Sequence, residues 1–171
     1  MSNAIESIRT DIAGLLPRLR RFARAITRNT ADADDLVQAA VERALLHTGQ
    51  WEPGTKLDSW IFRIMKNAWI DELRKRTRHN QLFAAEDEGE LVGVSHTEQQ
   101  IDAMAVRKAM KQLSDDQRLA VGLVLVEGLA YKEAAEVLDI PLGTLTSRLA
   151  RGREALQAIL SAGGTREEVR T

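Results

Sequence analysis

Polar side chains recur at helical spacing near the C-terminal end of the sequence. They stand at i, i+3, i+4 and i+7, and they are Thr144, Ser147, Arg148 and Arg151. Arginine can donate two hydrogen bonds to a guanine edge, and hydroxyl groups can bond to bases or phosphates. Leucines at 145, 149 and 156 lie on another face, as expected for a helix packed on one side. The pattern predicts a DNA-reading helix, and a solvated amphipathic helix is the alternative.

The residues before this stripe predict a helix-turn-helix. A short helix is expected over residues 131–138. The tight turn is assigned to Pro141, which cannot continue a helix, and to Gly143. In such motifs the second helix enters the major groove with its N-terminal residues on the base edges. Thr146 and Arg153 lie beside the stripe, where contacts with phosphates are expected.

The sequence offers no pattern for catalysis or metal binding. It contains no cysteine, and no two of its histidines, at 47, 79 and 96, are spaced at i, i+4. A glycine-rich phosphate loop is also absent. We therefore expect no enzyme, no cofactor and no metal ion.

The composition favours a soluble helical protein. Of 171 residues, 44% are hydrophobic and 4% aromatic, so the core must consist mainly of Leu, Ile, Val and Ala. No apolar run approaches the roughly 20 residues that cross a bilayer. The N-terminus also lacks the pattern of a signal peptide. A cytoplasmic protein without membrane insertion is expected.

Periodicity predicts an all-α protein with two small helical domains, at residues 1–78 and 100–161. A flexible acidic linker at 79–99 joins them, and a tail follows at 162–171. The expected helices cover about 5–26, 30–46, 57–78, 101–113, 114–127, 131–138 and 143–161. The second domain contains the helix-turn-helix.

The net charge of −1 hides separate patches of each sign. Residues 9–28 contain six arginines, and residues 56–78 contain seven basic side chains. Residues 80–106 contain six acidic side chains and no Lys or Arg. Basic patches of this kind favour a polyanionic partner such as nucleic acid.

Three sequence blocks follow one another along the chain. They are DADDLVQAAVERAL (32–45), SWIFRIMKNAWIDELRKRTR (59–78) and a block over 113–156 that ends in the DNA-reading helix. Together they resemble bacterial RNA polymerase sigma factors of the extracytoplasmic-function group, sigma-70 proteins that keep only regions 2 and 4. The resemblance covers about residues 10–78 and 107–160.

This resemblance implies a protein that binds core RNA polymerase, through the β′ clamp helices and the β subunit, and directs it to promoter DNA. It also implies an anti-sigma partner and a role in a stress response. The alternative is a stand-alone helix-turn-helix regulator that binds duplex DNA and needs no polymerase.

The resemblance assigns polymerase binding to the first block. The residues concerned are Asp34, Asp35, Gln38 and Glu42. The last three, spaced at i, i+3 and i+7, form a polar face opposite apolar residues. An ordinary solvated face, with first-turn acids that complement the helix dipole, is the alternative interpretation.

The second block resembles the element that melts the promoter and captures the −10 strand. Asn67 matches an asparagine that lines the pocket for a flipped base, and Trp51 falls where an aromatic ring often serves that pocket. An amide suits a base edge and a flat ring suits stacking. The basic side chains expected to hold the phosphates of the strand are Arg63, Lys66, Arg74, Lys75, Arg76 and Arg78. Packing of Trp51 at the edge of the core is the alternative.

Overall fold

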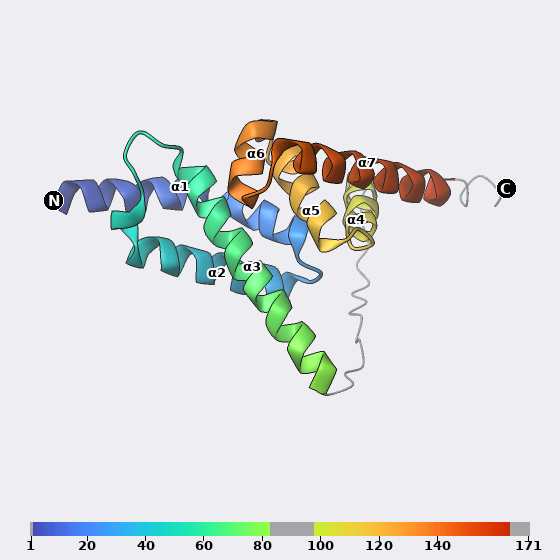
Figure 1. Cartoon of the computed structure of the whole chain (residues 1–171), viewed down its shortest axis with the longest axis horizontal. Coiled ribbons are helices and arrows are strands. Elements are labelled where there is room, and N and C mark those ends of the chain that lie inside the picture. Colours follow the sequence, from blue (N-terminus) through green and yellow to red (C-terminus); the bar gives the residue numbers. More distant parts are fainter. Residues whose placement is uncertain (1, 83–97, 165–171) are drawn as a thin grey trace. The chain divides into compact units, whose positions relative to one another are not determined.

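The computed structural model describes residues 2–82 and 98–164 (Figure 1). Every regular element in these two ranges is a helix or a helical turn, so the all-α prediction is confirmed. The chain divides into two compact units.

The first unit contains α1 (Ser2–Ile26) as far as Arg24, α2 (Thr30–Leu46), a 3-10 turn η1 (Thr48–Gln50) and α3 (Leu57–Leu82). Helices α2 and α3 pack against each other. Its buried apolar side chains include Leu19, Phe22, Ala40, Ile61, Phe62 and Met65. The rings of Phe22 and Phe62 meet edge to face with centroids 5.0 Å apart, which joins α1 to α3.

An ion pair also joins α1 to the start of α3. Arg18 Nη1 donates to Asp58 Oδ2 over 2.8 Å, and the Arg18 guanidinium lies 5.4 Å from the centre of the Phe62 ring. Asp58 stands in the first turn of α3, where its other oxygen accepts from the Ser59 N–H at 2.7 Å. The carboxylate therefore stabilises the helix N-terminus and fixes α1 against it.

The second unit contains α4 (Glu98–Met110), α5 (Asp115–Val121), a π-helical turn η2 (Gly122–Val126), α6 (Tyr131–Leu138) and α7 (Leu142–Gly164). A capping box between Ser114 and Gln117 begins α5. The helix predicted over 114–127 is not uniform, because its second half widens into η2. There the Glu127 N–H donates to the Gly122 carbonyl over 3.0 Å.

Helices α6 and α7 form the predicted helix-turn-helix, but a different residue makes the turn. Asp139 ends α6 with φ 54° and ψ 49°, the left-handed conformation that Asp tolerates better than most residues. The following N–H, of Ile140, donates to the Ala135 carbonyl over 3.1 Å. The prediction that Gly143 makes the turn is wrong, because Gly143 lies inside α7.

Close packing of α7 on α5 depends on Gly152. A Cβ atom added at Gly152 would lie 2.7 Å from Cγ2 of Val121. Val121 is 1% exposed and β-branched, so its side chain has little freedom to move away.

We expect Gly152→Ala to destabilise the second unit by about 1 kcal/mol. Overpacking costs about 1–3 kcal/mol, and the better helix propensity of Ala offsets about 1 kcal/mol of it. Amide hydrogen exchange of α5 and α7 measures the effect. Gly143→Ala is the matched control in the same helix, because nothing lies within 4 Å of its added Cβ. Equal protection in both variants would contradict the packing explanation.

The boundaries of the predicted linker change at both ends. Helix α3 continues to Leu82 and α4 begins at Glu98, so parts of the predicted 79–99 linker are helical. Helix α7 likewise extends past the predicted end at 161. Residues 83–97 and the tail from 165 lie outside the described residues. Within the described ranges, no helix is both long and apolar enough to cross a bilayer.

Candidate nucleic-acid and polymerase interface

Helix α2 presents a polar face with four exposed side chains. They are Asp34, Asp35, Gln38 and Glu42, which lie within about 100° around the helix axis. The opposite side is buried through Leu36, Val37 and Ala40. None of the four side chains has a hydrogen-bond or ion-pair partner within residues 2–82 and 98–164. This polar face, which carries three acidic side chains, is therefore available to a partner with basic side chains.

Helix α3 presents an exposed stripe with the opposite charge. Its residues, Arg63, Asn67, Arg74 and Arg78, follow one another at spacings of four, seven and four and are all exposed. At 100° per residue they fall within about 60° around the axis, and the stripe is about 22 Å long. The structure thus brings the predicted base-reading amide and three of the predicted phosphate ligands onto one side of a rigid helix.

The three other predicted phosphate ligands lie elsewhere on α3, and of these Lys75 is exposed. Lys66 is only 7% exposed, so its stem packs within the unit. Arg76 lies two residues from both Arg74 and Arg78, which places it on the opposite side of the helix, facing α2.

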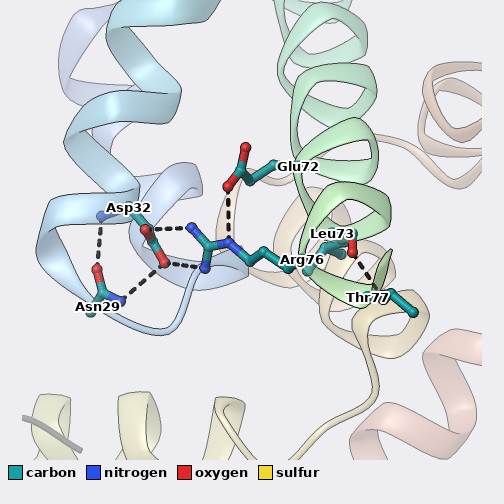
Figure 2. Close-up of polar contacts among 6 residues, drawn as sticks. All are labelled: Asn29, Asp32, Glu72, Leu73, Arg76 and Thr77. Carbon is teal, nitrogen blue, oxygen red and sulfur yellow. Dashed lines mark hydrogen bonds and ion pairs between the residues drawn. The ribbon is translucent and has the colours of Figure 1, made fainter. Parts of the chain in front are cut away.

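Arg76 holds the N-terminus of α2 (Figure 2). Its Nη1 and Nη2 donate to Asp32 Oδ2 and Oδ1 over 2.8 and 2.7 Å, a bidentate pair, and its Nε donates to Glu72 Oε1 over 2.9 Å. Asn29, the N-cap of α2, accepts from the Asp32 N–H at 2.8 Å. Its amide nitrogen donates to Asp32 Oδ2 over 3.0 Å. We call Asn29, Asp32, Glu72 and Arg76 the α2–α3 clamp.

The clamp changes the acid–base properties of its members. The hydrogen bonds from Arg76 hold the pKa of Asp32 below its usual value, although partial burial opposes the shift. The same bonds raise the pKa of Arg76 above its ordinary range. The Arg76 guanidinium also lies 5.4 Å from the centre of the Trp69 ring, whose face attracts the cation.

Trp51 stands between η1 and α3 and is half buried. Its indole Nε1 is shielded from solvent and has no hydrogen-bond partner among the described residues. The ring therefore packs partly against the unit, and its role in a pocket for a flipped base stays a prediction.

The stripe of α7 that is predicted to read DNA is partly or fully exposed along its length. Thr144 and Arg148 are half buried, whereas Ser147 and Arg151 are exposed. Arg148 Nη2 lies 3.5 Å from Oδ2 of Asp116, at the start of α5. This partner was not predicted, because it is 32 positions away and nothing local links the two residues. Arg151 has no side-chain partner among the described residues.

Two further predicted contacts of α7 lie on a separate face. Thr146 and Arg153 are exposed there, spaced at i, i+7. The Thr146 hydroxyl donates to the Leu142 carbonyl over 2.9 Å, so only its oxygen lone pairs are left for a phosphate-bound water or another donor. The Arg153 side chain has no hydrogen-bond or ion-pair partner among the described residues.

Family models match both units of the chain. Sigma-70 region 2 matches residues 12–79 and Sigma-70 region 4 matches residues 103–156. The region 2 match covers helices that a stand-alone helix-turn-helix regulator does not need, so that alternative is not supported.

Individual relatives agree with the family models. The chain is 33% identical over 162 residues to the ECF RNA polymerase sigma factor EcfG of Rhodopseudomonas palustris, covering 95% of this chain and 90% of the relative. It is 33% identical to the ECF sigma factor SigM of Mycobacterium tuberculosis, covering 90% and 76%.

A solved structure of a sigma factor also matches this chain. In the complex of the sigma factor RpoE with the anti-sigma factor NepR from Bartonella quintana, a chain 30% identical to this one matches with a TM-score of 0.83. The match covers 91% of this chain and 98% of that chain. With both regions present in order and relatives matched over nearly their full length, the chain belongs to the extracytoplasmic-function (ECF) RNA polymerase sigma factors.

Proposed function

We propose that this sigma factor uses three separate surfaces during promoter-specific initiation. The polar face of α2 binds core RNA polymerase. The exposed stripe of α3 captures the opened −10 strand, and the stripe of α7 reads the −35 duplex. The chain makes and breaks no covalent bond itself, and it acts in the cytoplasm, where polymerase and promoters meet.

One observation carries this proposal. The acidic side chains of α2 that match the polymerase-binding positions have no partner within the described residues, whereas Asp32, Asp58 and Glu72 in the same unit each pair with an arginine. Acids left unpaired on one helix face suit a basic partner surface, and complementary charge mainly sets specificity and association rate.

We further propose that an anti-sigma protein binds this chain and covers these surfaces. A similar sigma factor, RpoE of Bartonella quintana, is complexed with the anti-sigma factor NepR. A protein that covers the polar face of α2 would compete directly with polymerase for the same side chains.

Transcription with purified bacterial core polymerase tests the proposed function. A genomic fragment library is transcribed with and without the chain, and the 5′ ends of the RNA are sequenced. We expect discrete new start sites preceded by a shared pair of promoter elements. An unchanged set of start sites, together with tight binding of the chain alone to duplex DNA, would contradict the proposal.

A further inference from the structure

The basic run at the end of α3 contains one arginine that differs from its neighbours. Arg74 and Arg78 are exposed, while Arg76 donates to carboxylates on two helices. We propose that Arg76 is a positioning residue, not a DNA ligand, and that it couples the polymerase-binding face of α2 to the strand-capturing stripe of α3. This inference rests on the function proposed above.

The charge around Arg76 opposes a role in phosphate binding. Its single positive charge stands against the carboxylates of Asp32 and Glu72, so the three residues together carry a charge of −1. A phosphate that approached Arg76 would meet this net negative charge and would have to displace a bidentate partner. Among the described residues, the Arg74 side chain has only a long contact of 3.8 Å to the exposed Asp71.

The geometry of the clamp requires arginine in particular. A planar guanidinium can meet both oxygens of Asp32, bond Glu72 through Nε and stack near the Trp69 ring at the same time. A lysine keeps the charge but has one compact ammonium group. A phosphate contact, in contrast, tolerates lysine, because there the positive charge supplies most of the affinity.

The position of the clamp explains why it should affect both surfaces. Asp32 stands in the first turn of α2, two residues before Asp34 and three before Asp35. Arg76 stands midway between Arg74 and Arg78, the last two members of the exposed stripe. If the N-terminus of α2 moved against the end of α3, the polar face of α2 would be displaced relative to the exposed stripe of α3. Arg76 would affect both surfaces in this way without touching polymerase or DNA.

Substitutions at 76 and 74 separate positioning from phosphate binding. Holoenzyme carrying Arg76→Ala or Arg76→Lys should form open promoter complexes about tenfold less well, with an unchanged slope of log K against log salt. The matched control Arg74→Ala should lower that slope by about 0.7, the contribution of one phosphate contact on a single strand, and Arg74→Lys should restore it. If Arg76→Lys equals wild type and Arg76→Ala lowers the slope, Arg76 is a DNA ligand and the proposal is wrong.

A double-mutant cycle measures the clamp without polymerase. All three tryptophans, at 51, 60 and 69, lie in the first unit, so their fluorescence reports unfolding of that unit in urea. Between Asp32→Ala and Arg76→Ala we expect a coupling of about fivefold in the folding equilibrium constant, since the pair is bidentate and partly exposed.

The two experiments distinguish the possible failures. If the effects of Asp32→Ala and Arg76→Ala on stability are additive, and the wild-type chain starts transcription, only the proposed clamp is overturned. A wild-type chain that starts no transcription would overturn the proposed function, and the coupling of the two surfaces with it, while the cycle would still report whether Asp32 and Arg76 interact.

Discussion

Asp35→Arg is expected to weaken binding to core RNA polymerase by about 100-fold, which corresponds to about 3 kcal/mol. Asp35 is exposed on α2 and has no partner among the described residues, so the substitution removes no contact within the unit. It instead places a positive charge against a partner surface that is expected to be basic. Fluorescence titration of labelled chain with purified core polymerase gives the affinity.

Asp11→Arg is the matched control for this experiment. Asp11 is an exposed acid on α1 in the same unit, also without a partner in the described ranges, and its substitution changes the net charge equally. We expect affinity close to wild type. A similar loss in both variants would mean that polymerase responds to total charge, and the polar face of α2 would then have no special role.

The second large effect is expected at Arg151 of α7. Arg151→Ala should weaken binding of the holoenzyme to a promoter with an intact −35 element by about 10- to 100-fold, the value of one bidentate contact with a base. The loss should be largest for the original sequence and disappear when one particular base pair is changed. A panel of −35 variants of a promoter found by start-site mapping measures this.

Arg153→Ala provides the comparison for a phosphate contact. Arg153 is exposed on the separate face of α7, so its loss should weaken all −35 variants equally and lower the salt slope by about 0.9. Base-specific loss at Arg153 with uniform loss at Arg151 would reverse the assignment of the two faces.

Helix positions were largely predictable, because apolar residues repeat with a helical period and few prolines interrupt them. The helix at residues 131–138 has the predicted limits, and α3 and α7 only extend further than predicted. The turn was assigned to the wrong residue since Gly143 is the more familiar source of unusual backbone geometry. Instead Asp139 takes the left-handed conformation at the end of α6, where the Ile140 N–H donates to the Ala135 carbonyl.

The sequence supplied the residue types of the candidate sites, but it predicted the directions of their side chains less well. Basic character alone grouped Lys66 and Arg76 with the exposed arginines of α3. Helical spacing would have separated Arg76, which is two residues from Arg74 and Arg78. Its partner Asp32 is 44 positions away, and such a pair follows only from the packing of α2 on α3. The same holds for Asp116 beside Arg148.

The π-helical turn η2 bears on how this chain is aligned with its relatives. Its hydrogen bond from Glu127 to Gly122 spans five residues, one more than the bond of an α-helix. A relative that lacks one residue between 122 and 126 can close the turn as an ordinary α-helix, with the flanking residues kept in place. A one-residue gap in an alignment of this segment therefore reflects a change in helix width. It does not indicate a different length of the loop before the helix-turn-helix.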